Sequence, residues 1–115
     1  MNDLNSERKE LDAKLRSILG SSNSYVYFQP PENYKMKYPC IVYNLGTPRV
    51  LFANDKQYIK KRRYEITYIH DDPVSPITDI IHEAFQYCRF ERRFISDNKY
   101  HDVFTVFYDG GINNV

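Results

Sequence analysis

Residues 61–88, KRRYEITYIHDDPVSPITDIIHEAFQYC, decide the fold. Every second position from 64 to 68 is Tyr or Ile, and this two-residue period predicts a β-strand over residues 61–70. The HDDP sequence that follows is typical of a turn. Ser75 then Pro76 indicate a helix start, because Ser caps free N–H groups and Pro needs no partner there. The helix is expected to bury a stripe that reaches Cys88: Ile77, Ile80, Ile81, Ala84, Phe85 and Cys88.

The residues before this stretch predict a helix and two strands. Leu4, Leu11, Leu15 and Ile18 share one helical face, and Gly20 is a natural stop. Residues 25–28 and 40–45 are rich in β-branched and aromatic residues and are expected to be strands. Between them, QPPENYKMKYP (29–39) predicts an extended arm or loop, because proline fixes the backbone and lacks a donor.

The remaining segments complete a single domain over residues 1–115. Residues 46–58 are expected to form a bent strand or a long hairpin loop. Residues 89–96 and 100–108 flank Asp97-Asn98 and predict a hairpin, whose last strand is apolar on both sides and needs cover from the domain or a neighbour. Residues 109–115 are expected to be a loose tail. The order α-β-β-β-α-β-β predicts an α+β fold with a mostly antiparallel sheet.

Composition excludes several classes of protein. The 115 residues carry a net charge of +1, whereas dedicated nucleic-acid-binding proteins usually have a basic excess. No apolar run is long enough for a membrane span, and the polar start differs from a secretory signal. Cys40 and Cys88 form no CxxC motif and are expected to be reduced core thiols. We therefore expect a soluble protein made in a reducing cytoplasm, with no membrane partner.

The sequence offers little for catalysis. His70-Asp71, His82 and His101-Asp102 supply metal-ligand types, but an HExxH constellation is absent, and we expect turn and surface roles for them. No nucleophile elbow and no glycine-rich phosphate loop occur. We expect no enzyme activity, no cofactor and no metal. A metal-dependent phosphohydrolase is the least favoured of the functions that the sequence leaves open.

A run of four cations, residues 60–63, raises the alternative of nucleic-acid binding. Aromatic residues surround it, and Arg89, Arg92 and Arg93 add positive charge, so bases could stack and phosphates be neutralised. Strand alternation, however, places Lys60 and Arg62 on one face and Lys61 and Arg63 on the other. Charges of this kind also protect a strand end from aggregation. A small cytoplasmic nucleic-acid-binding protein is the alternative reading.

Three blocks of the sequence resemble a known family. They are YFQPPENYKMKYPCIVYNL (27–45), FANDKQYIKKRRYEITYIHDDPVSPI (52–77) and RFERRFISDNKYHDVFTVFY (89–108). Together they are similar to the tail completion, tail terminator or tail-to-head joining proteins of long-tailed bacteriophages. None of these blocks is a catalytic signature.

The resemblance implies a structural virion protein. Such a protein is assembled in the host cytoplasm into a homo-oligomeric ring, commonly a hexamer, at the head-proximal end of the tail. Its partners are the tail tube protein and the head-neck connector proteins, and genome DNA passes through the ring without specific binding. The family implies no cofactor and no reaction.

A ring of this kind needs two different contact faces on each subunit. The Pro-rich arm (29–39) and the final hairpin are the candidates, and the loop from Phe52 to Tyr58 is expected to reach the tube lumen or the next ring. The cations at 60–63 are expected to pair with acidic neighbours or to face a partner protein. The expected interface residues are Tyr34, Met36, Tyr38, Tyr43, Phe52, Tyr58, Lys60, Lys61, Arg62, Arg63, Phe104 and Tyr108.

Overall fold

The structure, a computed structural model, describes residues 4–20, 25–46, 49–53 and 57–108, with only the backbone described for 4–5, 49–53 and 57–61. The elements in chain order are α1 (Leu4–Leu19), β1 (Val26–Phe28), β2 (Cys40–Leu45), β3 (Arg49–Ala53), β4 (Gln57–His70), α2 (Pro76–Ala84), β5 (Cys88–Ser96) and β6 (Lys99–Tyr108). Within the described residues, neither helix is long and apolar enough to cross a membrane. The predicted α+β class with a mostly antiparallel sheet is confirmed, and the predicted helices and strands follow in the predicted order. Strand β3, within the segment expected to be a bent strand or a long hairpin loop, is a further strand between the two helices.

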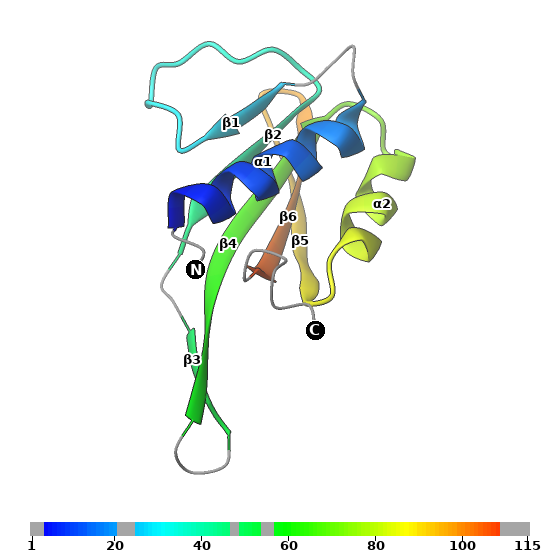
Figure 1. The fold of residues 1–115 in the computed structure, drawn as a ribbon. Helices are drawn as coiled ribbons and strands as arrows, with labels where there is room; N and C mark the ends of the chain where they lie inside the picture. Colours follow the sequence, from blue (N-terminus) through cyan, green and yellow to red (C-terminus); the bar gives the residue numbers. More distant parts are fainter. Residues whose placement is uncertain (1–3, 21–24, 47–48, 54–56, 109–115) are drawn as a thin grey trace.

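The strands form one sheet in the order β1-β2-β4-β6-β5, and β3 adds a further pairing to β4. The β1–β2 pair is parallel and the other pairs are antiparallel. Figure 1 shows both helices on the same side of this sheet. We call this the helix side and the opposite one the open side. The side chains of residues directly opposite each other on neighbouring strands point to the same side of the sheet. The strand register therefore shows whether each paired residue faces the helix side or the open side.

The core lies between the helices and the sheet. Leu11 and Leu15 of α1 and Ile81 of α2 are fully buried against the helix side of the central strands. The strand residues of this cluster include Tyr43, Tyr64, Ile66, Phe104 and Val106. The two-residue period seen at 64, 66 and 68 therefore marks the side that the helices cover.

Tyrosine hydroxyl groups fasten α1 to the sheet. Tyr43 donates to Asp12 (2.7 Å) and Tyr64 donates to Glu7 (3.1 Å). At the end of β6, Tyr108 donates to Glu10 (3.2 Å). A buried tyrosine fills space with its ring and needs a partner for its hydroxyl. Part of the high tyrosine content is thus explained by packing within one chain.

Helix α2 begins as predicted but ends earlier than predicted. Ser75 accepts a hydrogen bond from the backbone N–H of Ile77 (3.2 Å), and Pro76 occupies the first turn. The backbone becomes extended at Phe85, which caps the helix end. The expectation that the helical stripe continues to Cys88 is wrong, because Cys88 is the first residue of β5. Phe85 nevertheless packs in the core.

Strand β3 and the start of β4 form a two-stranded ribbon that leaves the body of the molecule (Figure 1). Its register runs from Arg49 opposite Lys61 to Ala53 opposite Gln57. The molecule measures 49 Å along its longest axis but only 26 and 24 Å along the others. The segment that was expected to form a bent strand or a long hairpin loop thus contains strand β3, whose backbone pairs with the start of β4. Strand β4 begins at Gln57, earlier than the predicted position 61. The tail 109–115 lies outside the described residues.

Candidate functional site

The edge strand β5 is the most exposed regular element among the described residues. It pairs with β6 on one side only, and every residue after Cys88 is exposed. The exposed side chains include three large apolar ones, Phe90, Phe94 and Ile95, the last with 67% of its surface accessible. The outer edge of a long strand offers backbone groups that can pair with another chain, although the four charged residues of β5 and the register shift between Phe90 and Arg92 restrict such pairing. This edge is the first candidate interaction surface.

The opposite edge of the sheet is protected in several ways. Strand β1 has only three residues, and Arg16 of α1 donates to the carbonyl of Val26 (3.1 Å). The Pro-rich arm bonds back to the same strand, because the backbone N–H of Lys37 donates to the Tyr27 hydroxyl (3.1 Å). Short length and capping are usual ways to prevent edge pairing. The two edges of the sheet therefore differ in their capacity to bind a partner.

Three of the predicted interface residues lie on the Pro-rich arm. Tyr34 and Tyr38 are exposed and Met36 is half-buried. The Tyr34 ring meets the Tyr27 ring edge-on at 5.3 Å, and the Lys99 ammonium lies 5.3 Å from the centre of the Tyr38 ring. These contacts hold the arm beside β1 and beside the beginning of β6.

Three further predicted interface residues, Arg62, Arg63 and Tyr108, lie where the C-terminal end of β6 pairs with β4. Arg62 pairs with Tyr108 in the β4–β6 register, and Arg63 pairs with Phe107. Arg62 Nε lies 3.3 Å from a carboxylate oxygen of Glu7, so the two side chains form an ion pair. The buried Nε–H makes no hydrogen bond to any acceptor among the described residues. The expected acidic partner thus exists for Arg62. A ten-residue strand spans about 30 Å, so the structure does not bring this group together with the arm.

Two predicted interface residues are not on the surface. Tyr43 and Phe104 are fully buried in the core of the single chain. The interface role predicted for them is wrong for this fold, because their rings fill the space between the helices and the sheet. Phe52, Tyr58, Lys60 and Lys61 lie on the backbone of the ribbon, and their side chains are outside the described residues.

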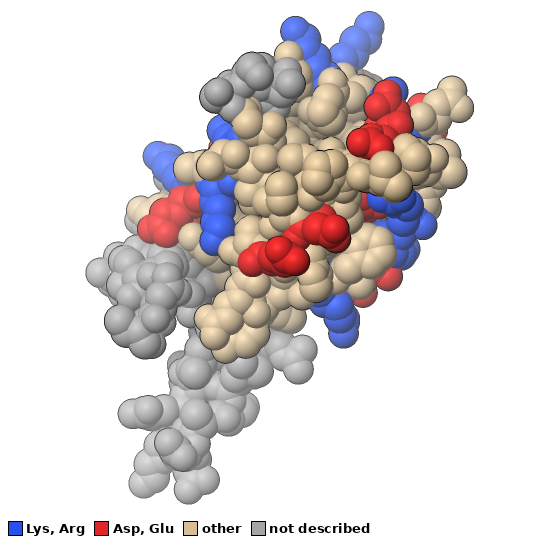
Figure 2. Space-filling model, turned by 90° about the vertical axis from the view of Figure 1, so that its right-hand side faces the viewer, with Lys and Arg blue, Asp and Glu red and all other residues tan. Residues whose placement is uncertain are grey.

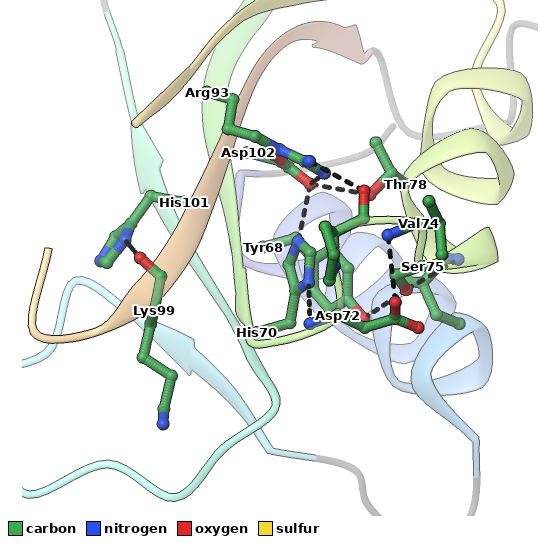
Figure 3. Close-up of polar contacts among 12 residues, drawn as sticks. Tyr68, His70, Asp72, Val74, Ser75, Thr78, Arg93, Lys99, His101 and Asp102 are labelled. Carbon is green, nitrogen blue, oxygen red and sulfur yellow. Dashed lines mark hydrogen bonds and ion pairs between the residues drawn. The ribbon is translucent and has the colours of Figure 1, made fainter. Parts of the chain in front are cut away.

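A buried polar network, centred on Asp102, lies where β4, α2, β5 and β6 meet (Figure 3). The fully buried Asp102 accepts hydrogen bonds from Arg93 Nε (2.5 Å) and Nη2 (2.9 Å), from Thr78 Oγ1 (2.7 Å) and from His70 Nε2 (2.8 Å). Arg93 also donates to the carbonyl of Pro73 (2.9 Å). A single carboxylate thus connects three strands, one helix and the turn between β4 and α2.

His70 uses both ring nitrogens inside this network. The backbone N–H of Asp72 donates to Nδ1 (3.2 Å), so Nε2 carries the proton that is donated to Asp102. The ring stacks on Tyr68 at 4.2 Å and is only 2% exposed. A histidine with both nitrogens engaged has no lone pair for a substrate proton. The surface and turn roles expected for His70 and Asp102 are wrong: the two form a buried structural pair.

Burial alone would raise the pKa of Asp102, but the hydrogen bonds from Arg93, Thr78 and His70 outweigh it and lower the pKa below its ordinary value. The hydrogen bond to Asp102 in turn raises the pKa of Arg93. Both groups are therefore charged at neutral pH. The network acts as a charged clamp that fixes the edge strand β5 to β6 and to α2.

The two cysteines are free thiols, and the residues that the structure describes contain no cluster of potential metal ligands. Cys40 is buried and Cys88 is half-buried, and both are free thiols. Burial raises the pKa of Cys40 to about 12 and that of Cys88 to about 11, so neither is a thiolate at neutral pH. No group of three or more potential metal ligands occurs among the residues that the structure describes.

A second exposed surface joins α2 to the helix side of β5. Phe90 lies opposite Phe104 and Ile95 opposite Tyr100, which places both on the helix side. Together with Ile80 and Tyr87 they expose four large apolar side chains, and Asp79 and Glu83 add negative charge. We call these six residues the α2–β5 face. Figure 2, which views the molecule from the α2 side, shows a broad uncharged area with acidic side chains on it and Lys and Arg side chains around it.

Sequence reasoning missed both the β5 edge and the Asp102 network. The alternation within residues 89–96 predicts a strand but does not reveal that the strand ends the sheet. The pairing of His70 with Asp102 spans 32 residues, and no local pattern predicts it. A usable signal was the presence of two His-Asp dipeptides at the facing ends of two predicted strands.

No protein-family model matches this sequence, and a search of curated proteins finds no significant match.

Proposed function

We propose that this protein is a structural subunit of a bacteriophage virion that assembles into a ring at the head-proximal end of the tail tube. There it ends tube polymerisation, joins the tail to the head, or does both. The observation that carries this proposal is the exposed strand β5 on a sheet whose other edge is capped. An exposed edge strand suits assembly with further copies or with a neighbouring tail protein.

Two other features support an assembling subunit. The β3–β4 ribbon extends beyond the body of the molecule (Figure 1), and an extended ribbon suits contact with another molecule. The buried polar groups around His70 are fully engaged with one another, which suits a scaffold better than a reaction centre. The tail location itself is supported by the resemblance of the blocks at 27–45, 52–77 and 89–108.

Nucleic-acid binding through Lys60–Arg63 has less support. Arg62 is on the helix side, where it pairs with Glu7, whereas Arg63 is exposed on the other side. A cation that is already paired has less charge to offer to a phosphate backbone.

The test is electron microscopy of lysates after the gene is inactivated in the phage that encodes it. Overlong tails without heads are expected for a terminator, and tails of normal length beside filled heads for a joining protein. A plasmid-borne wild-type gene should restore infectious particles. Ile95→Asp should restore them poorly and the exposed-site control Asp71→Asn should restore them fully. Intact, infectious particles without the gene would overturn the proposal.

A further inference from the structure

A bulge in β5 determines which side of the sheet each of its side chains faces. The register with β6 shifts between Phe90 and Arg92, so Glu91 is an extra residue in the strand. An extra residue reverses the side to which the following residues point. Phe90 lies on the helix side before the shift, and Arg93 and Ile95 lie on the helix side after it. The bulge therefore lets β5 reach the buried network and also places its two most apolar positions on one side.

The helix side of β5 is apolar and exposed. Phe90 has 42% of its surface accessible and Ile95 has 67%. The ring of Phe90 meets the ring of Phe104 edge-on at 5.4 Å, so the exposed ring is held in place by the core. The guanidinium that faces this side is already bonded within the buried network. Asp79 and Glu83 are exposed on the neighbouring helix, and they disfavour a partner that brings further carboxylates to this side.

The open side of β5 is basic. Arg89 and Arg92 both lie on it by the strand register. Arg89 Nε donates to a carboxylate oxygen of Glu91 (2.9 Å), the one acidic residue of the strand. The guanidinium of Arg92 lies 5.5 Å from the centre of the exposed Phe94 ring. A single carboxylate thus stands against two guanidinium groups, and β4 adds one exposed charge of each sign on this side.

The outer edge of β5 has no strand partner in the described part of the chain. A strand added at this edge would point alternate side chains to the two sides of the sheet. Its side chains would lie beside Phe90 and Ile95 on the helix side, and beside Arg89 and Arg92 on the open side. Apolar pairs and pairs of opposite charge stabilise neighbouring strands. The edge therefore fits an extended segment that is apolar on one side and acidic on the other.

A second copy of this chain does not supply such a segment. None of the strands that the structure describes carries more than one acidic residue. Two β5 strands side by side would bring together two segments that each contain three arginines and one glutamate. Like charges on neighbouring strands are destabilising. The complementary segment therefore belongs to a different protein.

We propose that β5 binds an extended segment of another protein as an added strand, in which apolar residues alternate with acidic ones. Backbone hydrogen bonds along the edge contribute affinity, and the alternating side chains contribute specificity. The inference rests on the proposed function, because it gives the chemistry of a neighbouring protein that contacts the same edge. Its test uses the purified protein and a synthetic peptide, so the two proposals can fail separately.

The experiment measures peptide binding by fluorescence anisotropy with the full-length protein, at low and at high salt. The probe is a fluorescein-labelled peptide as long as β5, in which valine and glutamate alternate. It should bind, and more weakly at high salt because the contact is partly electrostatic. Two control peptides should bind about tenfold more weakly or less. One has lysine in place of glutamate, and the other has the same composition with all glutamates grouped at one end.

Hydrogen exchange distinguishes an added strand from ionic attraction alone. The alternating peptide should slow the exchange of backbone amides within residues 92–96 of β5, because an added strand bonds to the backbone of the edge. Ionic attraction to the arginine side chains would leave the exchange of these amides unchanged. Unchanged exchange in the presence of bound peptide would therefore contradict strand addition.

Charge reversal at the edge tests the role of the arginines. Arg89→Glu/Arg92→Glu should weaken binding of the valine–glutamate peptide by about tenfold or more and should bind the valine–lysine peptide better than the wild type does. Circular dichroism checks that the variant is folded, and the single variant Arg92→Glu should shift binding in the same direction. The matched control Lys9→Glu/Lys35→Glu makes the same charge change at exposed sites on α1 and on the arm. It should bind as the wild type does.

Several outcomes would overturn the inference. They are an alternating peptide that does not bind, a grouped peptide that binds equally well, and arginine variants that bind normally. Exchange within β5 that slows with rising protein concentration, without any peptide, would show that a second copy occupies the edge and would overturn it too. Abnormal tails after gene inactivation would then still uphold the proposed function. Peptide binding as described, with intact phage lacking the gene, would overturn the function alone.

Discussion

His70 Nε2 lies 2.8 Å from Asp102 Oδ2, across a sequence separation of 32 residues, and both side chains are buried. The pair lies on the helix side of two neighbouring strands, and Arg93 and Thr78 complete the coordination of the carboxylate. Because Arg93 belongs to β5, the network fixes this exposed edge strand to the rest of the sheet. The stability of that edge should therefore depend on Asp102.

Replacing the carboxylate should destabilise the fold. Asp102→Asn removes the charge that faces Arg93 and misdirects one hydrogen bond, and we expect a loss of about 3 kcal/mol in the free energy of unfolding. Urea denaturation measures this loss. The control Asp71→Asn alters an exposed turn residue and should stay within about 0.5 kcal/mol of the wild type. Equal effects of the two substitutions would show that the network does not stabilise the fold.

The same carboxylate should make the free energy of unfolding depend on pH in the acidic range. The folded protein lowers the pKa of Asp102 from its ordinary value of 3.8, so as the pH falls the unfolded chain takes up this proton first. The contribution is complete above pH 3.8 and is lost as the pH falls through the lower folded-state pKa. Urea titrations across this range should show a steeper loss in the wild type than in Asp102→Asn. Parallel curves would contradict the assignment.

The stability of the protein at alkaline pH should depend on Tyr43 and Tyr64, which bond α1 to the sheet. Burial and the hydrogen bond to Asp12 raise the pKa of Tyr43 to about 12, and burial and Glu7 raise the pKa of Tyr64 above its ordinary value. Their contribution is complete below pH 10 and is lost as the pH rises through the folded-state values. In an ultraviolet titration of the folded protein, Tyr43→Phe should remove amplitude near pH 12. Loss of amplitude near pH 10 would instead indicate an accessible hydroxyl.

Local patterns predicted the elements of this fold but not the surfaces between them. The period of Tyr64, Ile66 and Tyr68 and the Ser75-Pro76 start depend on neighbouring residues only, and both are seen in the structure. The end of α2 was missed because Phe85 continues the apolar spacing while its backbone is already extended. Tertiary packing overrides a periodic signal of this kind.

The candidate interface was harder to predict for the same reason. Tyr43 and Phe104 look like interface residues by type, yet they line the core, because burial depends on which strands become neighbours. Phe90 and Ile95 have the same apolar character but are exposed, since β5 is at the edge of the sheet. Strand order is a property of the whole chain, and a single sequence carries no local sign of it.

Two adjacent isoleucines of α2 distinguish a role in the core from a role on the exposed α2–β5 face. Ile81 is fully buried in the core, whereas Ile80 is 45% exposed on the α2–β5 face. Ile81→Ala should reduce the free energy of unfolding by about 3 kcal/mol, because it leaves a cavity between α2 and the sheet. Ile80→Ala should leave stability within about 1 kcal/mol of the wild type and weaken self-association. Urea denaturation and sedimentation measure the two effects on the same samples. If Ile80→Ala leaves association unchanged, the exposed surface of α2 takes no part in self-association.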